Sequence, residues 1–114
     1  MRDDRERLLD IPEAIEKIES RLPTDQPAFN ADELVQTWVL HHLRILGEAV
    51  RGLSEEFRTR QPDLPYKSII GMRNILTYHY FEIDAEIVWS VLISDLPDLK
   101  AKVALILQTE NPSS

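Results

Sequence analysis

One segment of the sequence, from Gly71 to Trp89, gathers side chains that can act on a phosphate group. It holds an arginine, an asparagine, a histidine and two tyrosines, which are Arg73, Asn74, His79, Tyr78 and Tyr80. Arginine binds two phosphate oxygens together and stays charged, and histidine transfers protons near neutral pH. These groups predict a phosphodiester cleavage in which a base takes the ribose 2′-hydroxyl proton, the oxygen attacks the adjacent phosphorus, and a cation stabilises the developing charge.

The spacing of these residues sets a condition on the helix that carries them. At about 100° per residue, Tyr80 falls within about 20° of Arg73 on a regular helix. Tyr78 and His79 lie about 140° and about 120° away from Arg73, on opposite sides. We therefore expect either that the helix ends near Thr77, so that His79 swings back, or that His79 acts with the arginine of a second subunit.

Structural roles are also open for several of these residues. Arg73 can pair with a carboxylate such as Glu48 and lock two helices together, with Glu48 orienting the arginine. His41 and His42 are adjacent on a predicted helix and point in different directions, so we expect one at the edge of the core and one at the surface. No pattern of histidines and carboxylates suggests a metal site, and we expect neither a metal nor a cofactor.

Composition limits the class of protein. The chain has 114 residues, which suits one domain over 1–114, and it contains no cysteine. Its net charge of −7 argues against general binding of nucleic acid, so contact with RNA has to be local or built by assembly. No apolar run approaches the length that crosses a bilayer, and the charged first residues resemble no signal peptide. We expect a cytoplasmic protein with no membrane contact.

Apolar residues at steps of three and four predict an all-α fold of about five helices. The first helix carries the stripe Leu8, Ile11, Ile15, Ile18 and Leu22. Pro12 interrupts this stripe. Either the helix starts early and kinks at Pro12, or Asp10 caps it and Glu13 completes a capping box.

A long second helix is expected to begin at Asn30, with Glu33 completing its capping box and Phe29 packing against Leu34. Its predicted stripe is Leu34, Trp38, His41, Ile45, Ala49, Leu53 and Phe57. Gly47 lowers helix propensity there, and close packing of another helix is the expected reason. Such a helix can line a dimer interface.

Three further helices complete the expected bundle. The signals for their starts are Ser68 as a cap, Asp84 as a cap with Ile83 and Val88 as a staple, and Asp95 followed by Pro97. The last helix carries the stripe Leu96, Leu99, Val103 and Ile106.

Six short pieces of the chain, taken in order, resemble the HepT family of minimal HEPN toxins. These pieces are Leu8–Ile11, Ile45–Ala49, Gly71–Leu76, Tyr80–Asp84, Ile87–Trp89 and Asp95–Leu99. The resemblance covers nearly the whole chain. It implies an antiparallel HEPN-type helical bundle that forms a two-fold dimer, and a metal-independent endoribonuclease that is neutralised by a nucleotidyltransferase antitoxin of the MNT type.

The resemblance also implies roles for single residues. Arg73 orients the scissile phosphate of an RNA substrate and stabilises its charge, the motif histidine is the acid–base group, and Asn74 supports the site. Tyr80 matches the tyrosine that some MNT antitoxins modify with AMP, which adds bulk and negative charge where RNA binds.

The chain departs from the family pattern at one position. The family has a histidine five residues after the arginine, whereas this chain has Tyr78 there and His79 one residue later. The wider HEPN spacing still accommodates Arg73 with His79. Two alternatives to an active nuclease therefore stay open: a catalytically impaired dimer that only binds the antitoxin, or a toxin disabled by loss of the histidine from position 78.

Overall fold

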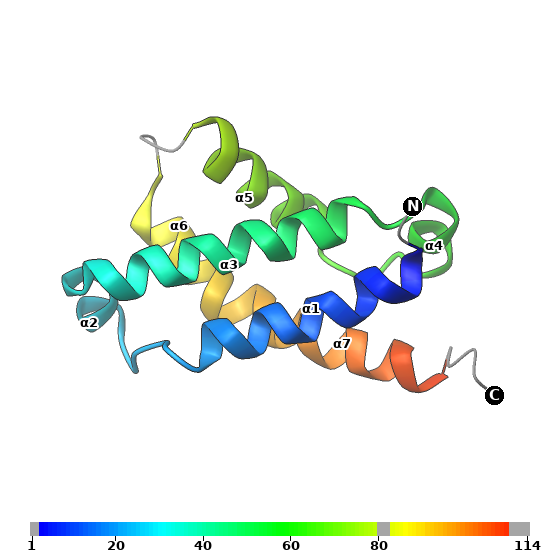
Figure 1. Cartoon of the computed structure of the whole chain (residues 1–114), viewed down its shortest axis with the longest axis horizontal. Helices are drawn as coiled ribbons and strands as arrows, with labels where there is room; N and C mark the ends of the chain where they lie inside the picture. Colours follow the sequence, from blue (N-terminus) through cyan, green and yellow to red (C-terminus); the bar gives the residue numbers. More distant parts are fainter. Residues whose placement is uncertain (1–2, 80–82, 110–114) are drawn as a thin grey trace.

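The computed structural model describes residues 3–79 and 83–109, and over these residues its regular structure is entirely helical (Figure 1). The predicted all-α class is confirmed. Tyr80, the expected modification site, lies outside the described residues. The elements are α1 (Asp4–Glu19), α2 (Gln26–Ala31), α3 (Glu33–Arg51), α4 (Glu55–Arg60), α5 (Tyr66–Tyr78), α6 (Ala85–Ser90), the π-helical turn η2 (Val91–Asp95) and α7 (Leu96–Thr109).

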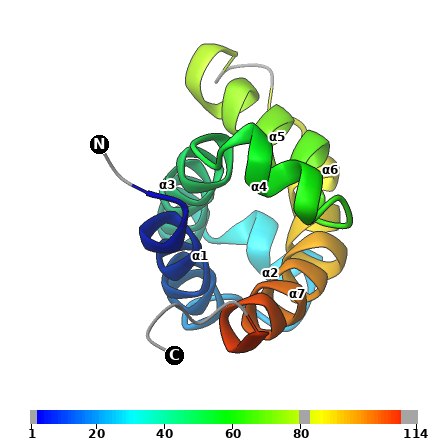
Figure 2. The ribbon, with the colours of Figure 1, turned by 90° about the vertical axis from the view of Figure 1, so that its right-hand side faces the viewer.

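Helix α3 is the centre of the arrangement, because it packs against α1 on one side and α5 on the other. It runs opposite to α1 (Figure 1), and α7 packs against α1. Seen along the bundle, the helices surround a common core, with α5 and α7 on opposite sides (Figure 2). In the ranges that the structure describes, no helix is both long and apolar enough to cross a membrane.

Helix α1 starts early and continues through Pro12. The Asp3 side chain caps it by accepting a hydrogen bond of 2.9 Å from the backbone N–H of Glu6. The predicted stripe is confirmed, since Leu8, Ile11, Ile15 and Ile18 are buried, and Leu22 packs against the core. Burial of this stripe outweighs the cost of about 3 kcal/mol that an interior proline imposes on a helix.

Helix α3 differs from its prediction at the start and in its buried face. Asn30 lies inside α2, and Asp32 caps α3 through the N–H of Val35. Leu34 is 83% exposed, and His41 and Ile45 are also exposed. The face turned to the core is mainly that of Val39, Leu43, Leu46 and Val50, and of the predicted stripe Ala49 and Leu53 are buried as expected. Because α3 has apolar residues on several faces, the packing of α1 and α5 decides which face is buried.

The end of α3 and the starts of the later helices are partly as predicted. The long helix ends at Arg51, and the fully buried Phe57 belongs to the separate helix α4, which Ser54 caps. Ser68 is not a cap, because α5 begins at Tyr66, directly after Pro65. Asp84 caps α6 as expected, accepting from the N–H of Glu86 at 2.8 Å.

The expected break at Asp95 is absent, and α6, η2 and α7 follow one another without a loop. A π-helical turn precedes Pro97, which has no N–H to give to an α-helical hydrogen bond. The stripe of the last helix is confirmed, because its four predicted residues, Leu96, Leu99, Val103 and Ile106, are all buried.

His42 generates a prediction about stability and pH. Its side chain is 6% exposed, and burial, followed by the charges of His41 and Lys17, lowers its pKa below the ordinary value of 6.5. The unfolded chain then binds a proton at a higher pH than the folded one, so the free energy of unfolding falls as pH drops below about 6.5. Between about pH 7.5 and about pH 5, the free energy of unfolding measured with urea should fall less for His42→Gln than for the parent.

His41→Gln is the matched control, because His41 is the exposed neighbour on the same helix. It should keep most of the parent's loss of stability at low pH. An equal loss in the parent and in His42→Gln would show that burial of His42 does not contribute to the pH dependence.

Candidate functional site

The site is built where α5 crosses α3 at Gly47. A Cβ atom on Gly47 would lie 2.2 Å from the Cβ of Arg73 and 2.7 Å from its Cγ. Real side chains cannot approach so closely, so only glycine allows this contact. The expected reason for Gly47, close packing of another helix, is confirmed, and the residue that packs there is Arg73 itself.

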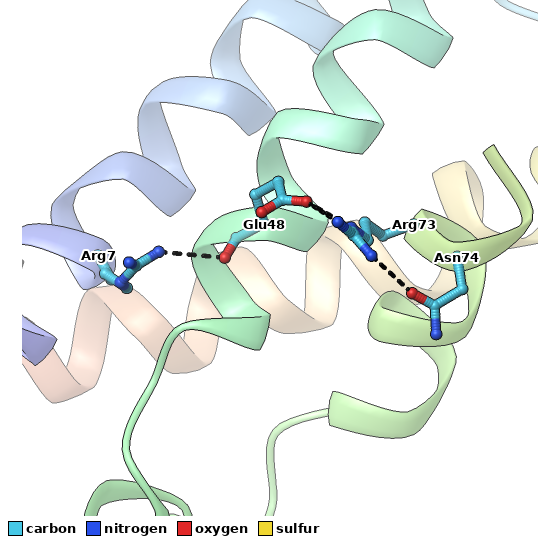
Figure 3. A network of polar contacts seen from close by, with 4 residues as sticks. All are labelled: Arg7, Glu48, Arg73 and Asn74. Atoms are coloured by element: carbon cyan, nitrogen blue, oxygen red, sulfur yellow. Dashed lines mark hydrogen bonds and ion pairs between the residues drawn. The ribbon is translucent and has the colours of Figure 1, made fainter. Parts of the chain in front are cut away.

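Contacts from two helices hold the guanidinium of Arg73 (Figure 3). Its Nη2 atom forms an ion pair with Glu48 Oε1, and Nε donates to the same oxygen at 2.5 Å. Its Nη1 atom donates to Asn74 Oδ1 at 3.0 Å. Arg73 is only 9% exposed, whereas the side chain of Glu48 is 48% exposed. The pairing of Arg73 with Glu48 that the sequence suggested is therefore present.

The held guanidinium keeps its charge and part of its donor capacity. The hydrogen bond to Glu48 raises the pKa of Arg73, against the lowering effect of burial. A guanidinium has five N–H bonds, and Nε, Nη1 and Nη2 each direct one toward a protein oxygen. One N–H on Nη1 and one on Nη2 are directed to neither Glu48 nor Asn74, and the Tyr78 side chain, which forms a hydrogen bond with the guanidinium, competes with a phosphate for them.

Tyr78 and His79 lie where α5 ends. Tyr78 is the last helical residue and is 68% exposed, and its ring centre lies 5.6 Å from Cζ of Arg73. An ideal helix separates these two residues, but the long arginine side chain reaches the aromatic ring at the helix end. His79 leaves the helical path with φ −133° and is exposed, while its N–H donates to the carbonyl of Ile75 at 2.9 Å.

The helix ends at Tyr78, near Thr77, as one of the two alternatives expected. The structure brings Arg73, Asn74, Glu48 and Tyr78 together and places His79 just beyond them along the chain. The expected position of Tyr80 beside Arg73 falls outside the described residues.

Arg7 is a supporting residue that sequence reasoning missed. Its Nη1 atom donates to the backbone carbonyl of Glu48 at 3.3 Å (Figure 3). A Cβ on Gly52 would lie 2.1 Å from Cζ of Arg7, so glycine also makes room for this guanidinium. A cation is favourable here because carbonyl oxygens at a helix C-terminus carry partial negative charge. No local pattern links two residues that lie 41 positions apart.

A groove lies along α3 one helical turn from the site. It has a volume of about 190 Å³ and is lined by Thr37, Leu40, His41, Arg44 and Leu76. His41 is exposed and His42 is buried, as their adjacency on a helix predicted. Within residues 3–79 and 83–109, no group of histidine, aspartate and glutamate side chains is arranged to hold a metal ion.

Comparison with known proteins connects this arrangement to one family. A family described as "Ribonuclease HepT-like" matches residues 11–106. "Putative RNase MJ1380" of Methanocaldococcus jannaschii is 35% identical over 92% of this chain and 97% of its own length. "Probable ribonuclease HepT" of Thermococcus cleftensis is 34% identical over 89% and 93%, and "Putative RNase TTE0752" of Caldanaerobacter subterraneus is 37% identical over 72% and 73%. No solved structure matches the chain significantly.

The contact at Gly47 predicts opposite effects for two glycine substitutions. Gly47→Ala should lower the free energy of unfolding by about 1–3 kcal/mol, because the added methyl group pushes α5 away from α3. Gly71→Ala should raise it by up to about 1 kcal/mol, because that helical position has open space and alanine favours the helix. Urea unfolding of both variants tests this, and equal effects would contradict the close contact.

Proposed function

This chain belongs to the HepT-like ribonuclease family, and we propose that it is a metal-independent endoribonuclease, the toxin of a HEPN/MNT toxin–antitoxin pair. The observation that carries the proposal is the guanidinium of Arg73, fixed between Glu48 and Asn74 at the end of a helix that presents Tyr78 and His79 to solvent. The relatives named as ribonucleases support RNA as the substrate.

Arg73 is the group that we assign to the scissile phosphate. Its orientation is set before substrate arrives, because Glu48 and Asn74 hold it from two helices. A positive charge held in a fixed position stabilises the negative charge of the transition state more than a mobile one does, since no group has to reorganise during the reaction. The remaining N–H bonds on Nη1 and Nη2 bind two phosphate oxygens and stabilise the charge that forms on them.

His79 is the acid–base group of the proposed reaction. A neutral imidazole takes the proton from the ribose 2′-hydroxyl, and the oxygen attacks the adjacent phosphorus. The bond from phosphorus to the 5′-oxygen breaks, and an imidazolium returns a proton to that oxygen. The products are a 2′,3′-cyclic phosphate and a 5′-hydroxyl, and water enters no step of this cleavage.

The working unit that we propose is a two-fold dimer. A second copy supplies a second Arg73 and a second His79, so that one histidine acts as base while the other acts as acid. Dimerisation also brings the two copies of Arg73 together, which gathers positive charge in a protein whose net charge is −7. His79 is exposed at the end of α5, on a surface that another copy can approach.

Control by the antitoxin is assigned to Tyr80, the residue that follows His79. In the transfer of AMP, the tyrosine hydroxyl loses its proton and attacks the α-phosphorus of ATP bound to a nucleotidyltransferase of the MNT type, and pyrophosphate leaves. The AMP group then lies beside the acid–base group. Added negative charge repels the RNA backbone, and added bulk blocks its approach. The antitoxin is therefore proposed as both a binding partner and a modifying enzyme.

A second candidate function follows from the contact between Tyr78 and Arg73. Tyr78 occupies the usual position of the family histidine, and its ring lies against the guanidinium that would bind phosphate. In this alternative the chain is a catalytically impaired HEPN dimer that binds the antitoxin without cutting RNA.

Substitutions at Arg73 and His79 separate the two candidates. For the nuclease, His79→Gln should slow RNA cleavage by roughly 10²- to 10⁴-fold, because proton transfer is lost. Arg73→Lys keeps the charge but not the paired donors and should slow cleavage by about tenfold or more. Cleavage of total RNA and growth arrest on expression are the measurements, with thermal melts to establish folding. A folded parent that cuts no RNA and is no more toxic than these variants would favour the impaired dimer.

Mass spectrometry tests the proposed control. The chain produced together with its neighbouring nucleotidyltransferase should gain the mass of one or more AMP groups, and peptide analysis should locate the first on Tyr80. Tyr80→Phe should abolish that adduct while leaving RNA cleavage near the parent's rate, because the tyrosine hydroxyl has no step in the proposed reaction. An unmodified parent would restrict the antitoxin to neutralisation by binding.

A further inference from the structure

The groove beside the site holds positive charge that the protein itself does not neutralise. Arg73 is compensated by Glu48. Arg44 lies one helical turn before Glu48, is exposed, and forms no ion pair or hydrogen bond with any residue of the described ranges. A substrate phosphate that approaches Arg73 also approaches the carboxylate of Glu48, so the net attraction there has to come from a further cation. Arg44 is a cation on the same side of α3, one turn from Glu48.

The groove runs along α3 away from Arg73. Its polar wall consists of Thr37, His41 and Arg44, which repeat at helical spacing and continue in line to Glu48. Arg44 and Glu48 are separated by about 6 Å along the helix axis, at 1.5 Å per residue. On the α5 side the groove is closed by Leu76, one turn beyond Arg73. The groove therefore lies one helical turn from the site on both helices, at Arg44 of α3 and at Leu76 of α5.

We propose that this groove binds the nucleotide next to the scissile phosphate, with Arg44 on its phosphate and the ring of His41 against its base. The inference rests on the proposed ribonuclease function and extends that site. Leu40 and Leu76 are the apolar part of the lining, against which a base can pack. Thr37 adds a hydroxyl group at the end farther from Arg44. The site therefore takes single-stranded RNA, since a base paired in a duplex cannot enter a groove between two helices.

The size of the groove favours a nucleotide over a protein segment. A volume of about 190 Å³ is below the range of about 300–1,000 Å³ that is typical of pockets for whole small molecules. It suits one base with its phosphate at the mouth, whereas a partner helix needs a long apolar channel. In a chain whose net charge is −7, Arg44 gives this groove a local attraction for phosphate.

Binding of RNA and cleavage of RNA are measured separately to test the proposed nucleotide site. The binding probe is a fluorescein-labelled single-stranded RNA with 2′-O-methyl riboses, which lacks the attacking hydroxyl. Fluorescence anisotropy is recorded over a range of salt for the parent, Arg44→Gln and His41→Gln. Lys102→Gln is the control, because it removes one partly exposed positive charge, paired with Asp98, from α7, and no residue of α7 lines this groove. Cleavage of the ordinary RNA of the same sequence gives KM and kcat.

Arg44→Gln should raise the Kd roughly tenfold and make the slope of log Kd against log salt shallower by about 0.7, the value of one single-strand phosphate contact. His41→Gln should raise the Kd about fivefold without changing that slope, because stacking is lost rather than charge. Both should raise KM more than they lower kcat, since neither residue touches the reacting atoms. Lys102→Gln should bind RNA like the parent.

If folded Arg44→Gln binds RNA as tightly as the parent, the inference is overturned. If the parent still cuts RNA in that case, the proposed ribonuclease function stands. A parent that binds RNA through Arg44 but does not cut it supports the groove and contradicts the nuclease. If Arg44→Gln instead changes the mass of the assembly in size-exclusion chromatography with light scattering and leaves RNA affinity unchanged, the groove is an interface between copies and the inference fails.

Discussion

The close contact of α5 with α3 at Gly47 is the constraint on which the rest of the site depends. Without a Cβ at this position, the base of the Arg73 side chain lies directly against α3. The guanidinium then reaches Glu48, the next residue after Gly47, and its Nη1 atom donates to Asn74. A wider spacing of the two helices would leave the arginine free to move and the carboxylate without its partner.

Electrostatics explain why the arrangement needs more than one arginine. In a chain with a net charge of −7, Arg73 is held in place by Glu48, and the same carboxylate weakens its attraction for a phosphate. Orientation and net charge therefore come from different residues. Arg73 provides a fixed pair of donors, Arg44 provides uncompensated charge one turn away on α3, and a second copy of the chain would add to both.

The sequence predicted some elements well and others poorly, for a physical reason that differs between helices. The stripe of α1 was correct because its apolar residues lie on one face, so only one way of burying them exists. In α3 apolar residues occupy several faces, and Leu34 and Ile45 are exposed although they belong to a regular stripe. Local capping signals failed at Asn30 and Ser68, because Asp32 and Pro65 nearby provide other starts for the helices.

By itself the sequence determined the all-α class, the family resemblance and the expectation of a helix contact at Gly47, and it left the pairing of Arg73 with Glu48 as one of several open roles. These follow from residue types and from intervals along the chain. Only the tertiary structure decided that Arg7 supports Glu48 from 41 positions away, that the Tyr78 ring reaches Arg73, and that His41 and Arg44 line a groove closed by Leu76. Such contacts depend on which faces of packed helices meet, and intervals within one helix carry no information about that.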